Sequence, residues 1–247
     1  MPEVCFGNKT RFLKFFSGAD DNYANDLKEK YDSEEIQIVA APKEYYGSDL
    51  TEIKHNWGDS DERIIWRTRQ CLDYLFMWNI GKEYDYFLQL EDDVQIDRGF
   101  LEFVRMQIEQ KKDDPDWIVM EFSEMGFIGK LFRKESLAKL ITYTKLFYRV
   151  KPIDLIYWAF VGMQACLPEY RPDKCRPLVA KLALRFPGKK FLHHMGRVSS
   201  LDGKISHLGD TNPSVDAEKL ETNLNKESVL RFYNGQKGRF QNIYLDI

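Results

Sequence analysis

Three adjacent carboxylates, Glu91-Asp92-Asp93, follow directly on the apolar segment Tyr84–Leu90. Ionised carboxylates at this spacing repel one another unless a positive charge lies among them. A divalent cation supplies that charge, and hard oxygen ligands suit Mg²⁺ or Mn²⁺. A metal held at the end of a strand is also what a nucleotide diphosphate site needs, because the metal bridges the two phosphates and neutralises the charge of a departing diphosphate.

Two other interpretations fit the same three residues, which we call the acidic cluster. A solvated acidic turn at the start of the next helix is common in globular proteins. A phosphatase of the Asp-x-Asp type also places its nucleophile after a hydrophobic strand, but the position of Val94, immediately after the cluster, matches its spacing poorly. Taken alone, the acidic cluster leaves the metal site and the acidic turn open.

The periodicity of apolar residues predicts the elements that position the cluster. Strands are expected at Arg11–Phe16, Glu35–Ala40, Tyr84–Leu90, Asp116–Phe122 and Phe191–Met195, and helices at Glu62–Asn79, Phe100–Lys112 and Ser136–Arg149. Strands that alternate with helices favour an α/β fold, with a central and mostly parallel sheet flanked by helices. Open α/β sheets bind ligands just beyond the carboxyl ends of their strands, which is where the acidic cluster lies.

The expected helix Glu62–Asn79 has two chemically different sides. Its apolar side carries Ile65, Leu72, Leu75 and Phe76, which we expect to face the core. Its other side carries Arg63, Arg67 and Gln70. Arginines in such positions are either simply solvated or, near a diphosphate, able to bind it, so Arg67 is a candidate donor-binding residue.

Length and charge limit the classes of protein that the chain can represent. Its 247 residues suit one large domain, and 43% hydrophobic with 30% charged residues is the balance of a globular protein. We expect a catalytic domain over residues 1–209 and a loosely attached polar tail over residues 210–247. A net charge of -3 argues against nucleic acid as a partner. Because no apolar run approaches about 20 residues, we expect no membrane segment in this chain.

Cys166 and Cys175 bracket a loop that a disulfide would close. The alternative is two free thiols in a reducing compartment, and the spacing of the cysteines does not decide between them.

Five segments make the pattern around the acidic cluster much more specific. In this order along the chain, from about Pro42 to Lys204, they resemble N-acetylglucosaminyltransferase IV, the enzymes of glycosyltransferase family 54. The matching segments are Ile65–Tyr74, Phe87–Val94, Met120–Phe132, Phe147–Asp154 and Gly196–Lys204.

The resemblance implies a GT-A-like fold and a defined reaction. Members of that family are Golgi membrane proteins with a lumenal catalytic domain, so it implies a location in the Golgi lumen. They use Mn²⁺ and transfer GlcNAc from UDP-GlcNAc to the α1,3-linked mannose arm of N-glycans, forming a β1,4 branch with inversion. It therefore implies UDP-GlcNAc as donor and the N-glycan of a glycoprotein as acceptor.

The resemblance also assigns residues around the donor. Asp93 would hold the metal, with Glu91 and Asp92 around the ribose and the sugar. His194 would complete the metal shell, although a histidine packed in a buried strand fits the same position. The family has two cysteines nine positions apart where Cys166 and Cys175 stand, which implies that these two form a disulfide.

An inverting transfer needs one base to take the proton of the acceptor hydroxyl. Asp154 follows a helix and a Lys-Pro break, where related inverting enzymes place their base, and is the first candidate. Glu121 and Glu124 are alternatives, and either one fits a role in positioning the acceptor sugar instead. A helix-capping role for Asp154 after Pro152 stays open.

Several departures from the family leave a second function open. The family's first strand should lie upstream of Phe12, and the residues there do not match. Where the family reads Trp, two Leu and Asp after the candidate base, this chain reads Leu155-Ile-Tyr-Trp158. An indole thus replaces a carboxylate. The alternative to an active transferase is therefore a truncated or divergent inactive homologue that binds a nucleotide sugar or glycan without turnover.

Overall fold

The structure is a computed structural model of residues 1–247. It describes residues 9–16, 29, 36–47, 50, 58–91, 94–166, 171–186, 190–194 and 239–246. Among these residues, no helix combines the length and the apolar character that crossing a membrane requires.

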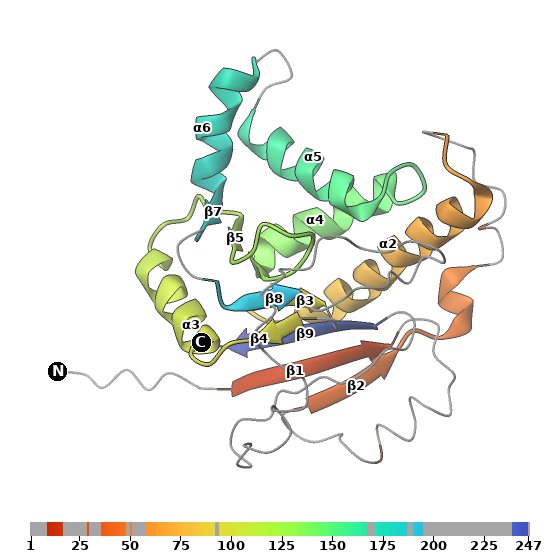
Figure 1. Ribbon diagram of the computed structural model, residues 1–247, viewed down its shortest axis with the longest axis horizontal. Coiled ribbons are helices and arrows are strands. Elements are labelled where there is room, and N and C mark those ends of the chain that lie inside the picture. Colours follow the sequence, from red (N-terminus) through yellow and green to blue (C-terminus); the bar gives the residue numbers. More distant parts are fainter. Residues whose placement is uncertain are drawn as a thin grey trace, which may run out of the picture.

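A seven-stranded sheet forms the centre of the fold (Figure 1). Its strands, in spatial order, are β2 (Ile36–Ala40), β1 (Lys9–Phe16), β9 (Arg239–Asp246), β3 (Tyr86–Glu91), β6 (Lys130–Arg133), β5 (Val119–Glu121) and β7 (Ala183–Arg185). A second ribbon pairs β4 (Val94–Ile96) with β8 (Leu192–His194). The helices are η1 (Lys43–Tyr46), α2 (Asp61–Gly81), α3 (Phe100–Lys111), α4 (Lys134–Phe147), α5 (Ile153–Ala165) and α6 (Pro172–Leu182).

The α/β class is confirmed, but the sheet is mixed rather than mostly parallel. Only the pairs β1/β2 and β5/β7 are parallel, and the other four ladders are antiparallel. The short connection between β5 and β6 forces those two strands into an antiparallel hairpin, since a parallel pair needs a long crossover. Followed from strand to strand, the pairings leave β1, β2, β3, β5 and β7 running in one direction, with β6 and β9 opposed to them.

Strand β9 corrects the interpretation of residues 210–247 as a loosely attached tail. Its backbone pairs with β1 from Lys9↔Asp246 to Phe16↔Arg239, and with β3 from Tyr86↔Leu245 to Glu91↔Phe240. These eight residues are thus an inner strand of the sheet. Residues 195–238 lie outside the described residues, and the domain boundary at residue 209 stays a prediction.

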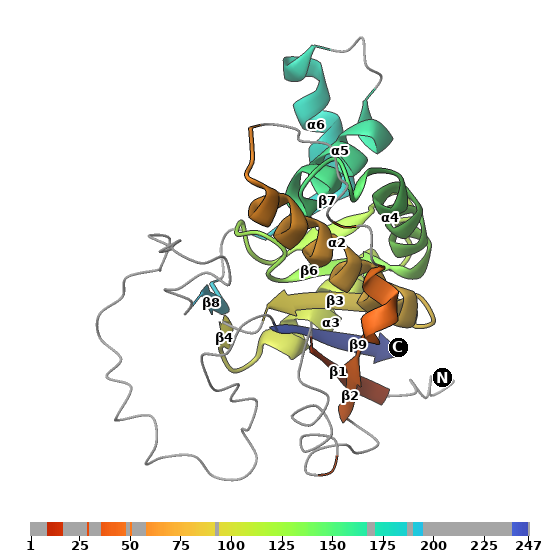
Figure 2. The same ribbon diagram turned by 90° about the vertical axis from the view of Figure 1, so that its right-hand side faces the viewer.

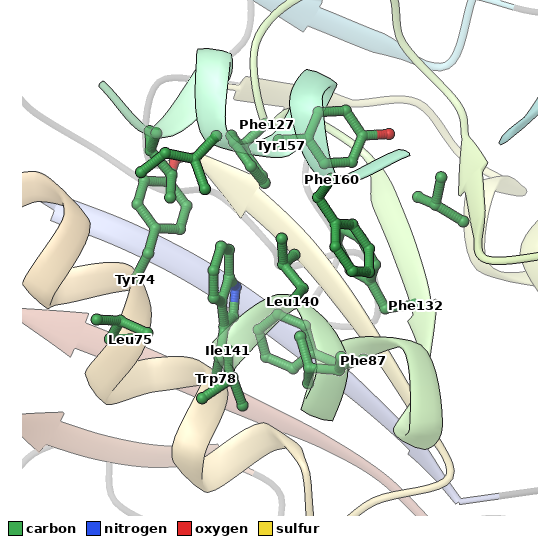
Figure 3. Packing of buried hydrophobic residues seen from close by; sticks show 14 of the residues in the cluster. Tyr74, Leu75, Trp78, Phe87, Phe127, Phe132, Leu140, Ile141, Tyr157 and Phe160 are labelled. Atoms are coloured by element: carbon green, nitrogen blue, oxygen red, sulfur yellow. The ribbon is translucent and has the colours of Figure 1, made fainter. Parts of the chain in front are cut away.

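Both faces of the sheet are buried at β3 and β6, where successive side chains of a strand point to opposite sides. On one face, α2, α4 and α5 cover Phe87 and Phe132, and their side chains converge over β3 and β6 (Figure 3). On the other face, α3 covers Leu88 and Leu131. In Figure 2, α2 crosses in front of the strands and α3 lies behind them. Since β3 and β6 are covered on both sides, the strand ends are where a ligand can reach this part of the sheet.

Helix α2 starts where capping residues predict. The Ser60 side chain accepts a hydrogen bond of 3.4 Å from the backbone N–H of Arg63, and Asp61 and Glu62 lie in the first turn, where the helix dipole favours acids. The buried face is rotated from the predicted one. Of the four predicted core residues only Leu75 is fully buried, and the buried stripe runs instead through Ile64, Arg67, Cys71, Tyr74 and Trp78.

Helices α5 and α6 were not predicted. Helix α5 is apolar almost throughout, so that it has little periodicity, but Pro152 provides a start signal at its N-cap. Helix α6 begins with Pro172, a residue suited to the first turn. The expected disulfide is present: Cys166 and Cys175 are bonded, with their Cα atoms 5.6 Å apart, and tie the end of α5 to α6.

Candidate active site at the carboxyl end of β3

Glu91 is the last residue of β3 and is half-buried at the carboxyl edge of the sheet. The hydroxyl of Tyr74, on α2, donates a 3.3 Å hydrogen bond to its Oε1 atom. Burial raises the pKa of Tyr74 well above its usual value, and the negative charges of Glu91 and Asp154 raise it further. The hydroxyl therefore stays protonated and acts as a fixed donor. The other two members of the acidic cluster, Asp92 and Asp93, lie outside the described residues.

The hairpin between β5 and β6 also approaches Glu91. Gly126 has a φ of 37°, and a Cβ atom at this position would lie 3.4 Å from Glu91 Oε1. The left-handed backbone and the narrow gap both favour glycine here. The Glu91 carboxylate is thus held between a tyrosine hydroxyl and a glycine backbone, neither of which the acidic pattern alone revealed.

Glu121, at the end of β5, is buried and its two carboxylate oxygens are both engaged. Oε1 accepts a 2.5 Å hydrogen bond from the Tyr157 hydroxyl and lies 3.5 Å from Lys130 Nζ. Oε2 accepts a 2.6 Å hydrogen bond from Arg185 Nε. With one buried carboxylate facing two cations and a hydroxyl, Glu121 acts as an anchor for its neighbours.

Lys130, on β6, is the buried cation of this group. Burial lowers the pKa of the Lys130 ammonium, and the Glu121 carboxylate opposes that change. Its Nζ atom also donates a 2.6 Å hydrogen bond to the carbonyl of Ser123 in the hairpin. Lys130 thereby links the hairpin that carries Gly126 to the buried carboxylate of Glu121.

Asp154 lies in the first turn of α5 and is exposed. Its negative charge contributes to the raised pKa of Tyr74. Like Glu121, but more weakly, it also opposes the lowering of the Lys130 pKa by burial. The structure thus brings Asp154 to the same sheet edge as Glu91. The N-cap of α5 is Pro152, with no side-chain capping bond, so that Asp154 is not the capping residue. Glu124, the third candidate base, is exposed in the hairpin.

Arg67 is buried rather than solvated, with a relative exposure of 2%. Its Nη1 atom lies 3.1 Å from Asp59 Oδ2, and Asp59 also pairs with Arg63. Within the described part of the chain, the buried Nε and Nη2 atoms have no hydrogen-bond partner. Buried charged groups require such partners, so we expect the guanidinium to have a further hydrogen-bond acceptor. Arg67 lies two helical turns from Tyr74, about 10 Å along the axis.

The ribbon β4/β8 brings the late histidines next to the acidic cluster. His194 pairs with Val94, the residue that follows Asp93, and its Nδ1 atom is buried. His193 points to the other side of the ribbon, where its Nε2 atom lies 2.9 Å from Asp97 Oδ2. The described residues contain no group of three metal-binding side chains, but Asp92 and Asp93 are not among them.

A cavity of about 320 Å³ lies elsewhere, at the amino end of β3. Tyr86, the first residue of β3, is five strand positions from Glu91, or about 17 Å. Both acidic and basic side chains line this cavity: Asp85, Glu109, Lys112, Arg133, Lys134 and Glu135. The cavity is therefore separate from the carboxyl end of β3, where the candidate residues Glu91, Glu121 and Asp154 lie.

Comparison with known proteins agrees with the sequence pattern. The family model "MGAT4 conserved region" matches residues 13–212. The chain is 34% identical over 197 residues to alpha-1,3-mannosyl-glycoprotein 4-beta-N-acetylglucosaminyltransferase A of Bos taurus, covering 79% of this chain and 36% of that protein. It is 36% identical over 190 residues to the Mus musculus form A, covering 76% and 35%, and 35% identical over 184 residues to the Homo sapiens form B, covering 74% and 33%.

The chain spans about a third of the length of these relatives. No solved structure matches it. Since the family model covers most of the chain, from β1 to beyond β8, the chain belongs to the MGAT4 conserved-region family.

Proposed function

We propose that the chain is an inverting glycosyltransferase that moves GlcNAc from UDP-GlcNAc to a mannose of an N-glycan and forms a β1,4 branch. The names of the relatives support this reaction class. The observation that carries the proposal is the arrangement at the carboxyl edge, where Glu91 is fixed by Tyr74 and Asp154 lies nearby. We further propose that the common direction of β1, β2, β3, β5 and β7, with the acidic cluster after β3, represents a GT-A-like sheet.

On this proposal, the donor binds along the edge between α2 and β3. Glu91 and Asp92 orient the ribose and the sugar by accepting hydrogen bonds from their hydroxyls. The buried guanidinium of Arg67 has two N–H directions without a partner in the described residues, and a diphosphate oxygen supplies the missing acceptor. Tyr74 contributes by keeping the Glu91 carboxylate in one orientation.

Asp93 and His194 are the proposed ligands of Mn²⁺ or another divalent cation. Carboxylate with imidazole is a donor set suited to Mn²⁺, and this choice of ligands is supported by the pairing of His194 with Val94, the residue after Asp93 in the sequence. When bound, the metal supplies Lewis-acid neutralisation of the charge on the departing diphosphate.

Asp154 is the proposed base. The acceptor hydroxyl transfers its proton to the Asp154 carboxylate while its oxygen bonds to the anomeric carbon, and the bond from that carbon to the diphosphate breaks on the opposite face. UDP leaves with the bonding electrons. Glu121 is less suited to this task, because both of its oxygens are already engaged by Tyr157, Arg185 and Lys130. We assign Glu121 to positioning.

The direct test is UDP release from UDP-GlcNAc with a biantennary N-glycan acceptor, in Mn²⁺ and again in excess chelator. Turnover that depends on metal and acceptor supports the proposal. The second candidate function, an inactive homologue that binds a nucleotide sugar or glycan without turnover, is favoured by the indole of Trp158, where the family resemblance implies a carboxylate. UDP binding without release of UDP would favour that function. Absence of both UDP binding and glycan binding in Mn²⁺ would contradict both.

The Golgi lumen is the proposed location, and the disulfide agrees with an oxidising compartment. In protein secreted from cells and then denatured without reductant, we expect Cys166 and Cys175 to resist alkylation until they are reduced, as followed by peptide mass spectrometry. Cys71 is the internal control, because it is a free thiol and must react in the same unreduced sample. Alkylation of Cys166 and Cys175 before reduction would contradict the proposed compartment.

A further inference from the structure

Trp158 is a large aromatic side chain left 43% exposed on α5. It follows Asp154 by four residues, so that both side chains lie on one side of the helix, about 6 Å apart along its axis. Tryptophan is usually well buried, and an exposed indole beside a candidate base is a common sign of a binding surface.

The guanidinium of Arg185, at the end of β7, lies over this indole. Its Cζ atom is 5.2 Å from the centroid of the Trp158 ring, a distance at which cation and ring attract each other. The Arg185 side chain is 49% exposed. Within the described residues its only hydrogen bond runs from Nε to Glu121. The remaining guanidinium N–H groups are therefore donors that solvent or a ligand can satisfy.

The buried Glu121 explains why this exposed pair has one fixed arrangement. Its Oε2 atom accepts a 2.6 Å hydrogen bond from Arg185 Nε, and its Oε1 atom accepts a 2.5 Å hydrogen bond from the Tyr157 hydroxyl. Tyr157 precedes Trp158, with the two rings 5.4 Å apart. Because Glu121 and Tyr157 are both buried, the arginine and the indole are supported by the core rather than by other surface side chains.

We propose that Trp158 and Arg185 form the platform on which the acceptor sugar binds. A pyranose ring has an apolar C–H face that packs on an aromatic ring, and hydroxyls at its rim that accept hydrogen bonds from a guanidinium. A sugar on Trp158 spans the distance of one helical turn, which brings a rim hydroxyl to the Asp154 carboxylate. This inference rests on the proposed function and deepens its acceptor side.

The same geometry assigns the donor to another part of the edge. Arg67 and Tyr74 are on α2 and Glu91 ends β3, whereas Trp158 and Arg185 come from α5 and β7. Loss of the indole should therefore weaken the binding of the glycan and leave the binding of the nucleotide unaffected. The platform also gives Glu121 a positioning role, since this residue holds Arg185 and so acts on the acceptor without touching the acceptor.

The test is calorimetric binding of a biantennary N-glycan, with UDP and Mn²⁺ present, to the wild-type chain and three variants. Trp158→Ala should raise the glycan Kd about tenfold, which corresponds to about 1.4 kcal/mol. Trp158→Phe retains an aromatic face and should recover most of that loss. Leu155→Ala is the matched control, because Leu155 is 40% exposed on the same helix and is not part of the platform. The Kd for UDP should be unchanged in all three.

Failure of the platform and failure of the proposed function give different results, because binding is measured without turnover. If the wild-type chain binds the glycan through Trp158 but releases no UDP, the platform is supported and the proposed transferase activity is contradicted. If the wild-type chain binds no glycan, or if Trp158→Ala binds it like the wild type, the platform is overturned. A raised Kd for UDP in Trp158→Ala would also overturn it, since the indole would then belong to the nucleotide site.

Discussion

Asp154→Asn should reduce turnover by a factor of about 100 to 10,000 while leaving the affinity for UDP-GlcNAc nearly unchanged. The amide keeps the size of the side chain but cannot take the proton of the acceptor hydroxyl. Because Asp154 is exposed and is not the N-cap residue of α5, the change should have little effect on folding. Initial rates of UDP release, with donor and acceptor varied separately, measure the effect on kcat and on each KM.

Glu121→Gln is the companion variant for this experiment. If Glu121 positions the acceptor through Arg185, its loss should mainly raise the acceptor KM. The variant also leaves Lys130 and Arg185 without their buried carboxylate, a loss of about 3–5 kcal/mol in comparable buried pairs, so its melting temperature must be measured with its kinetics. A large fall in kcat for a folded Glu121→Gln, together with a near-normal Asp154→Asn, would transfer the role of base to Glu121.

Asp93→Ala should abolish the metal-dependent binding of UDP. The change removes a proposed metal ligand, and without it the metal that would neutralise the charge of the diphosphate would no longer be held. Calorimetry of UDP binding with and without Mn²⁺ measures the loss, and the circular dichroism spectrum reports whether the fold is intact. Asp113→Ala is the matched control, because it removes an exposed carboxylate from the turn after α3. Unchanged UDP affinity of Asp93→Ala at saturating Mn²⁺ would mean that the metal is bound elsewhere.

The elements around the acidic cluster could be predicted because they are long or strongly periodic. The segment Tyr84–Leu90 is mostly apolar and lies within one or two residues of β3, and the helix Ser136–Arg149 overlaps α4. Helix α5 was missed because nearly all of its residues are apolar, which removes the periodic signal. Strand β9 was missed because its pairing with β1 and β3 depends on residues far away in the sequence. Its own surroundings in the chain are polar.

The partners within the site were harder to predict than its candidate residues. The sequence pattern singled out Glu91, Glu121 and Asp154, and the structure brings all three to one region. It did not reveal that Glu121 is bound by Tyr157 and Arg185, because 36 and 64 positions separate these residues from it. It also assigned Arg67 to the solvated face of its helix, since an arginine in a buried stripe gives no sign of burial in the sequence.

The inner position of β9 has a consequence for how the protein is made. Leu88 of β3 pairs with Ile243, and Phe12 of β1 pairs with the same residue from the other side. At a synthesis rate of about 5 to 20 residues per second, roughly 7 to 30 s pass between the emergence of β3 and that of β9. During this time β1 and β3 both expose unpaired backbone edges, which favour association with other chains. The nascent chain therefore depends on protection from aggregation until the strand that completes its sheet has left the ribosome.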